Sequence, residues 1–281
     1  MIGIIIQART SSTRLPMKVL LPLPYNSKTT VLEQVIKRCK VSKLADEVIV
    51  ATTTKPEDER IVDIATKMNV GIFRGSEKDV LSRYYHTAKE FSVDVIVRIT
   101  SDCPCIDPNV IDMVIKKYID NNVDYVSNTL ENTFPRGQDV EVFSFECLKE
   151  AYFNATRTFE REHVTPYIYM NPNSRYRLMN IRAPSHLTDP TIRITLDTEE
   201  DYALLCSVYD YLYTKNELFG LEDIIRLFKE KPWLKLINKK IQQKKIYTSD
   251  KEEVIDAIKI LELQDLKTAA NILRKYLNQG E

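Results

Sequence analysis

The stretch Ile4-Ile5-Ile6-Gln7-Ala8-Arg9-Thr10-Ser11-Ser12-Thr13-Arg14-Leu15-Pro16-Met17-Lys18 predicts both the fold class and the place of a site. Its apolar beginning is long enough for one buried strand and too short for a helix. The polar loop that follows carries three cations, Arg9, Arg14 and Lys18, with four hydroxyl side chains among them. Because ligands of open parallel sheets bind outside the carboxyl ends of the strands, we expect this loop to bind phosphate oxygens. A solvated basic loop is the alternative interpretation.

Beyond this loop, short apolar runs alternate with segments in which apolar residues recur at helical spacing. This alternation is typical of βαβ units and a mostly parallel sheet. We predict strands at residues 47–52, 71–73, 93–99 and 124–127, and helices that begin near Val31, Pro56, Asp79 and Pro108.

The pattern changes in the second half of the chain. Irregular segments separate predicted strands at 139–143, 176–181 and 191–196, with predicted helices at 146–155 and 160–169. Beyond Trp233 only helical signals remain, so we expect one α/β domain over residues 1–238 and a helical C-terminal appendage over residues 239–281. The appendage carries no candidate chemistry, and packing or oligomerisation accounts for its apolar face.

Composition excludes several classes of protein. The 281 residues include 40 basic and 40 acidic side chains, so no charge excess favours nucleic acid or an anionic membrane as a partner. No apolar run reaches 18 residues, and no basic segment precedes the N-terminal apolar run. The five cysteines are odd in number and scattered, which favours a reducing cytoplasm. The six glycines form neither a P-loop nor a G-x-G-x-x-G motif.

Two aspartates are candidate ligands of a metal ion. Asp102 follows the predicted strand at 93–99, and Asp197 follows the one at 191–196. Carboxylates at the ends of two strands can meet over one crevice and hold Mg²⁺, which prefers one or two carboxylates together with phosphates and waters. The alternative is a helix N-cap, which is strongest for Asp197 because residues 198–201 look like an acidic first turn.

The motif Ala8-Arg9-x-x-Ser12-x-Arg14-Leu15-Pro16-x-Lys18 resembles the signature of the cytidylyltransferases that make CMP-activated sugar acids. Up to about residue 238, the chain is similar to the branch named after spore coat polysaccharide biosynthesis protein F. Met17 departs from the pattern, because the family usually has Gly there. Further motifs of the branch match in order at Glu47–Thr53, Phe73–Tyr84, Val97–Pro104, Asp124–Thr129, Glu162–Tyr167 and Leu196–Asp201.

The resemblance implies a Rossmann-like α/β/α sandwich of the nucleotidyltransferase type, with an arm that pairs subunits into a homodimer. It also implies transfer of CMP from CTP to an acidic sugar or related polyhydroxy acid, with release of pyrophosphate, for surface polysaccharide or glycoconjugate biosynthesis. Asp102 and Asp197 match the family's metal-binding carboxylates, so Mg²⁺ is the expected cofactor. Lys18, Arg14 and Asp102 are the expected catalytic residues. The expected nucleotide-binding positions are Ala8, Arg9, Ser12, Arg14, Lys18, Arg83 and Thr100.

The sugar side of the site is less defined. Asn128, Gln138 and Asp139 follow the predicted fifth strand and are weaker candidates for contact with a polyol. His163 suits a substrate contact and a structural role equally well, and a general base less well. Asp79 and Arg83 are spaced for an i,i+4 ion pair, which is the alternative to a nucleotide contact for Arg83.

Two other functional classes remain open. A glycosyltransferase of similar fold commonly has Asp-x-Asp after its fourth strand, whereas this chain has Asp102-Cys103-Pro104. A non-catalytic nucleotide-binding protein is the second class. The presence of all the cations and carboxylates named above argues against it.

Overall fold

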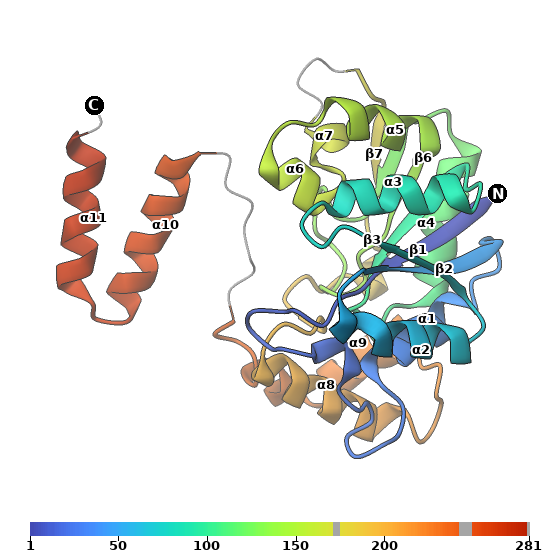
Figure 1. Ribbon diagram of the computed structural model, residues 1–281. Helices are drawn as coiled ribbons and strands as arrows, with labels where there is room; N and C mark the ends of the chain where they lie inside the picture. The colour runs from blue at the N-terminus through green and yellow to red at the C-terminus, as the bar shows by residue number, and fades with distance from the viewer. Residues whose placement is uncertain (171–174, 242–248, 280–281) are drawn as a thin grey trace. The chain divides into compact units, whose positions relative to one another are not determined.

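The computed structural model describes residues 1–170, 175–241 and 249–279. The chain divides into two compact units, Met1–Ile241 and Gln242–Glu281. In the described part of the first unit, seven strands form one sheet in the order β3-β2-β1-β4-β6-β5-β7 (Figure 1).

The sheet is parallel on one side and mixed on the other. β1 pairs in parallel with β2 and β4, β2 with β3, and β5 with β7, whereas β6 is antiparallel to both β4 and β5. This mixed α/β architecture confirms the predicted fold class. The strands are β1 Ile2–Gln7, β2 Glu47–Thr53, β3 Gly71–Gly75, β4 Val95–Thr100, β5 Tyr125–Ser127, β6 Glu141–Ser144 and β7 Leu178–Asn180.

Helices cover both faces of the sheet because its central strands are apolar on both sides. In β1, Ile4 and Ile6 pack against one group of helices and Ile5 against the other, and all three are fully buried. One face carries α1 Val31–Cys39, α2 Glu59–Lys67, α4 Pro108–Asp120, α8 Glu199–Leu212 and α9 Leu221–Glu230. The other carries α3 Val80–Glu90, α5 Phe145–Asn154, α6 Thr158–His163 and α7 Pro166–Tyr169. Short 3-10 turns lie at η1 Lys18–Leu20, η2 Pro56–Asp58, η3 Ser185–Leu187 and η4 Pro232–Leu236.

Two predicted elements differ from the structure. The helix predicted at 160–169 is divided into α6 and α7, because Val164 has a positive φ of 74° and Pro166 starts a new helix. The strand predicted at 191–196 is wrong, since with the described residues this segment makes only an isolated bridge, between Arg136 and Arg193. Its apolar side chains are buried, but its backbone bonds to loops instead of a sheet strand. The helix α9 has no counterpart among the predicted elements.

The second unit contains a helical hairpin, α10 Asp250–Leu263 and α11 Lys267–Gln279. The turn between the helices includes Asp265, which has a positive φ of 58°. Ile258 of α10 and Ala270 of α11 are the buried apolar side chains of the hairpin. In the described residues of the whole chain, no helix combines the length and apolar character needed to cross a membrane.

Candidate active site

The register of the sheet brings two loops together at the carboxyl ends of β1 and β4. Gln7 is paired with Thr100, so both strands end at the same level. The basic loop starts at Ala8, and Asp102 lies two residues beyond Thr100. These loops therefore begin side by side although they are more than 80 residues apart in the chain.

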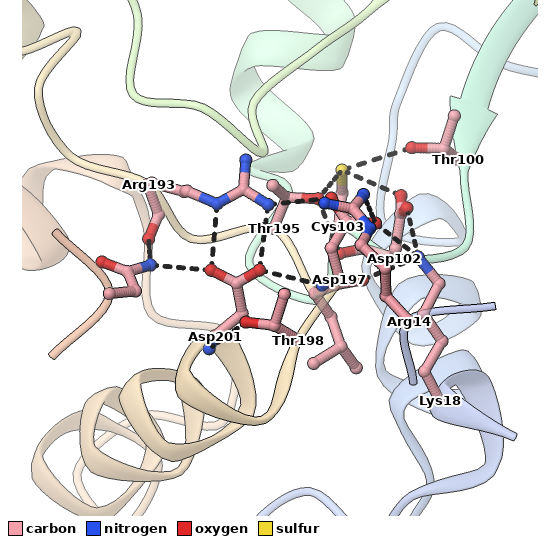
Figure 2. A network of polar contacts seen from close by, with 12 residues as sticks. Arg14, Lys18, Thr100, Asp102, Cys103, Arg193, Thr195, Asp197, Thr198 and Asp201 are labelled. Carbon is pink, nitrogen blue, oxygen red and sulfur yellow. Dashed lines mark hydrogen bonds and ion pairs between the residues drawn. The ribbon is translucent and has the colours of Figure 1, made fainter. Parts of the chain in front are cut away.

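Lys18 joins the basic loop to both candidate carboxylates (Figure 2). Its Nζ donates to Asp102 Oδ2 at 2.8 Å, to Asp197 Oδ1 at 3.0 Å and to the carbonyl oxygen of Leu196 at 2.7 Å. An ammonium group has three donors, so all of those of Lys18 are used. The structure thus places Asp102 and Asp197 within reach of one ammonium group.

Burial and charge act in opposite directions on these three groups. Burial alone raises the pKa of Asp102, but the Lys18 ammonium outweighs it and lowers the pKa to about 2. The pKa of Asp197 is lowered as well, because Lys18 and Arg193 offset its burial. Burial lowers the pKa of Lys18, but the two carboxylates raise it further, so the net shift is upward. Both aspartates are therefore ionised and Lys18 is protonated at neutral pH.

Asp197 is held from both of its oxygens. Arg14 lies 3.0 Å from Oδ1, the oxygen that also faces Lys18, and Arg193 lies 2.8 Å from Oδ2. The N-cap of α8 is Thr198, whose hydroxyl accepts from the N–H of Asp201. Asp197 is therefore not the helix cap, and its side chain faces the cations instead.

A close backbone approach places Asp197 beside Asp102. The N–H of Leu196 donates to the carbonyl oxygen of Asp102 at 2.8 Å, and Ile194 donates in the same way to Arg136. Gly137, the residue after Arg136, has a φ of +102°, and a Cβ atom at this position would lie 2.7 Å from the carbonyl oxygen of Ile194. A glycine is required at this point, because only glycine permits both the conformation and the distance.

The basic loop is folded around Thr10. Its N–H and hydroxyl both donate to Asp58, at 2.8 and 2.7 Å, and its carbonyl oxygen accepts from Ser12 and Met17. Asp58 is 1% exposed and also accepts from the hydroxyl of Thr53. Met17 has φ 60° and ψ 15°, the left-handed conformation that glycine adopts without steric cost. This conformation is a physical reason to expect Gly at this position.

The other predicted nucleotide positions lie around this loop. Ala8 is buried, Ser12 is half-buried, and Arg9 is exposed. Arg83 is 2% exposed and donates to the carbonyl oxygen of Ser76, while its Nε has no partner among the described residues. Burial lowers the pKa of Arg83, and the nearby charge of Arg9 adds to the effect. The Thr100 hydroxyl contacts Cys103 Sγ at 3.3 Å, next to Asp102.

Asp79 does not pair with Arg83, so the i,i+4 alternative is wrong. Asp79 caps α3 through the N–H of Ser82 and binds Arg161, whose Nε and Nη2 both donate to one carboxylate oxygen. The side chain of Arg83 bonds instead to the carbonyl oxygen of Ser76.

The sugar-side candidates fall into two groups. Asn128 and Gln138 are buried, and their side-chain amides bond to the backbone. Asn128 donates to the carbonyl oxygen of Gln138 and accepts from the N–H of Val140. Gln138 donates to the carbonyl oxygen of Cys105 and accepts from the N–H of Asp107. Asp139 is half-buried, and its pKa is raised to about 6 by burial and by the charges of Glu141 and Asp102, against Arg136. His163 is the last residue of α6, on the face of the sheet that carries α3.

Sequence reasoning missed four residues that support the site: Asp58, Arg193, Asp201 and Asn238. In the sequence, Asp58 and Asp201 have the positions of ordinary acidic residues in the first turn of a helix. Arg193 lies within the strand predicted at 191–196, where nothing marks it as a site residue. The only local signal was the four-residue spacing of Asp197 and Arg193, which suits an ion pair on a helix but not on a strand. Asn238 offers no signal at all, since its partners are tens of residues away.

The donor set fits a hard divalent cation. Asp102 and Asp197 offer ionised carboxylate oxygens at one place, and Mg²⁺ commonly takes one or two carboxylates and completes its shell with phosphates and waters. Among the described residues, His, Cys, Asp and Glu form no cluster of three or more that would bind a metal without such help. The hydroxyl of Thr195 donates to the carbonyl oxygen of Asp102.

A parallel sheet half, a basic loop after β1 and two carboxylates at neighbouring loop ends define an α/β protein of the nucleotidyltransferase class. The family model for cytidylyltransferases matches residues 3–279, so the chain belongs to the cytidylyltransferase family. This confirms the resemblance inferred from the motifs.

Individual relatives support the assignment. An uncharacterised protein of Methanocaldococcus jannaschii is 42% identical over 240 residues, which cover 85% of this chain and 95% of that protein. The spore coat polysaccharide biosynthesis protein SpsF of Bacillus subtilis is 35% identical over 207 residues, 73% of this chain and 85% of that one. A solved cytidylyltransferase from Leptospira borgpetersenii has a TM-score of 0.77 and 35% identity, covering 88% of this chain and 98% of that chain.

Proposed function

We propose that this cytidylyltransferase transfers CMP from CTP to an acidic sugar or a related polyhydroxy acid, with release of pyrophosphate. The observation that carries the proposal is the contact of one basic-loop lysine, Lys18, with both Asp102 and Asp197. The relative from B. subtilis is named for polysaccharide biosynthesis, which supports a sugar-derived acceptor for surface polysaccharide or glycoconjugate synthesis.

The reaction is the attack of an acceptor oxygen on the α-phosphorus of the triphosphate. A P–O bond forms to the acceptor, the bond to the pyrophosphate oxygen breaks, and the acceptor proton is lost to solvent or a nearby base. Such a displacement depends on positioning and charge neutralisation more than on covalent help from the protein. Arg14, Lys18 and Arg9 would orient the phosphates, with Ala8, Ser12, Arg83 and Thr100 as further contacts of the nucleotide.

Asp102 and Asp197 would hold Mg²⁺ as the cofactor, which when bound supplies charge neutralisation to phosphate oxygens. Asp139 is the best placed of the sugar-side candidates, because it lies close enough to Asp102 for the charge of that carboxylate to contribute to its raised pKa. Asn128 and Gln138 would act indirectly, by holding the loops around Asp139. For His163 we retain the weaker role of a substrate contact.

The test is pyrophosphate release with each of the four nucleoside triphosphates, Mg²⁺ and a panel of acidic sugars. We expect release with CTP and at least one sugar acid, and loss of turnover by at least about 100-fold in Asp102→Asn. Asp107→Asn is the matched control, since Asp107 is a buried carboxylate that caps α4 and accepts from Leu221. Hydrolysis of a nucleotide sugar without any use of CTP would favour the glycosyltransferase class. Full activity in Asp102→Asn would refute the proposed site.

We further propose a cytoplasmic homodimer that is formed through the arm at residues 136–185, of which residues 171–174 lie outside the described part. The support is an aromatic cluster on α3 and α5: Tyr85 stacks on Tyr152 with centroids 4.2 Å apart, and Phe153 beside them is 67% exposed. Aromatic side chains are enriched in protein interfaces. Sedimentation should give twice the chain mass of 32.7 kDa, and Phe153→Arg should lower it. Tyr25→Arg, at an aromatic residue that is 59% exposed outside the arm, is the control. A wild-type monomer at micromolar concentration contradicts the proposal.

A further inference from the structure

A second group of side chains reaches Asp197 from the oxygen that Lys18 does not contact (Figure 2). Arg193 Nη2 lies 2.8 Å from Asp197 Oδ2 and 2.9 Å from Asp201 Oδ2, and its Nε donates to Asp201 Oδ1 at 2.9 Å. The side chain of Asp201 is 0% exposed, and that of Arg193 is 10% exposed. One guanidinium group thus links Asp197 to a buried carboxylate.

Asn238 completes this group from the far end of the first unit. Its Nδ2 donates to Asp201 Oδ1 at 2.8 Å and to the carbonyl oxygen of Arg193 at 3.0 Å, and the residue is 6% exposed. Asp201 also accepts from the backbone N–H of Asp197 at 3.0 Å. The two carboxylate oxygens of Asp201 therefore accept from the guanidinium group of Arg193, from the side-chain amide of Asn238 and from the backbone N–H of Asp197.

We propose that Arg193, Asp201 and Asn238 form one positioning unit that holds Asp197 with its Oδ1 directed toward the basic loop. An aspartate on a loop can rotate about two side-chain bonds, and neither rotation is fixed by Lys18 alone. The contact of Arg193 with Oδ2 and the bond from the Asp197 backbone to Asp201 restrict both the side chain and its backbone. None of the three residues needs to touch a substrate.

This inference rests on the proposed function only in taking Asp197 as a ligand of the cation. Partners behind a metal ligand typically change metal affinity by about 10- to 100-fold when they are removed. The fork of Arg193 cannot be reproduced by lysine, which offers a point charge instead of two fixed donors. A purely structural ion pair would change stability when mutated, but would leave the affinity of the folded protein for metal unchanged.

The experiment uses the full chain and Mn²⁺ with a non-hydrolysable CTP analogue, followed by proton relaxation enhancement of water. We expect the Mn²⁺ concentration for half-saturation to rise about 10- to 100-fold in Arg193→Lys and about 3- to 10-fold in Asn238→Leu. Asp107→Asn serves as the control, because it removes a buried capping carboxylate away from Asp197. Folding of each variant is checked by near-UV circular dichroism, and Asn238→Leu decides the matter if Arg193→Lys does not fold.

A double substitution tests whether Arg193 acts through Asp197. In an Asp197→Asn background, Arg193→Lys should change the half-saturation by less than about twofold, since the residue it positions is already lost. The inference is overturned if folded Arg193→Lys and Asn238→Leu reach half-saturation at a Mn²⁺ concentration within about twofold of wild type. It is also overturned if the wild-type protein forms no ternary complex with Mn²⁺ and the analogue. If Mn²⁺ and the analogue bind as expected but no sugar acid yields pyrophosphate, the proposed function fails and the positioning unit stands.

Discussion

Replacing Lys18 by Met removes a charge that the structure places between two carboxylates. The side chain of Lys18 is 11% exposed, and those of Asp102 and Asp197 are 24% and 17% exposed. Removal of one partner from a buried ion pair costs about 3–5 kcal/mol, because the remaining charge stays uncompensated. The partial exposure of the carboxylates reduces this cost, so we expect a loss of about 2–4 kcal/mol in the free energy of unfolding at pH 7. An exposed loop cation, in contrast, would contribute within about 0.5 kcal/mol.

Urea denaturation at pH 7 measures this difference, with Arg14→Met as the matched control. Arg14 makes one ion pair with the same Asp197, but its side chain is 39% exposed, so its loss should cost less than about 1 kcal/mol. Lowering the pH to about 4 should narrow the gap between Lys18→Met and wild type. The reason is that without Lys18 the burial of Asp102 raises its pKa, and protonation then relieves the variant. If Lys18→Met unfolds within about 0.5 kcal/mol of wild type, the buried ion pairs do not stabilise the fold and the reasoning is refuted.

Three further predictions concern the surroundings of the site. In Met17→Gly, the left-handed conformation no longer costs the about 1–2 kcal/mol that it costs a non-glycine residue, but the apolar contacts of Met17 are lost. We therefore expect a thermal unfolding midpoint near that of wild type, and an affinity for CTP, measured by calorimetry, that is equal or higher. Gly137→Ala should destabilise by at least about 2 kcal/mol in urea and lower turnover, since its Cβ would meet the Ile194 carbonyl; an unchanged protein would contradict the close approach. Asp139 has its pKa raised to about 6, so the folded protein binds the extra proton and its stability falls as the pH rises from about 4 to about 6. Asp139→Asn should remove about 2–3 kcal/mol of that decline in urea titrations at pH 4 and 7, and a decline equal to wild type would count against this assignment.

The parallel half of the fold was predictable because its signals are local. Residues 2–6 and 47–52 are mostly apolar runs too short for helices, and the strands they form are buried on both faces, as strands of a parallel sheet are. The segment 191–196 shows where this reasoning stops. It has the alternation and burial of a strand, but its partners are the loops at Arg136 and Asp102, and no local pattern distinguishes a loop partner from a strand partner.

The candidate site could be predicted as a set of residues but not as a set of contacts. Arg14, Lys18, Asp102 and Asp197 were all identifiable from the ends of predicted strands. That Lys18 faces both carboxylates while Arg9 faces neither depends on the turn at Thr10, which Asp58 holds from 48 residues away. The pairing of Asp79 with Arg161 instead of Arg83 shows the same limit, because a distant partner displaced the local one.

The charges around Asp197 bear on the proposed binding of CTP. Lys18, Arg14 and Arg193 face Asp102, Asp197 and Asp201, so the six formal charges cancel. A triphosphate that chelates one divalent ion retains negative charge, and a neutral set provides it little long-range attraction. If the chain binds CTP as proposed, we expect that attraction to come from a cation outside the set, and Arg9 is exposed at the start of the loop. Arg83 lies near Arg9 but is only 2% exposed. Lys18 can contact a phosphate only by giving up one of its three hydrogen bonds, so in the proposed reaction we expect phosphate binding to weaken its hold on a carboxylate or on the Leu196 carbonyl.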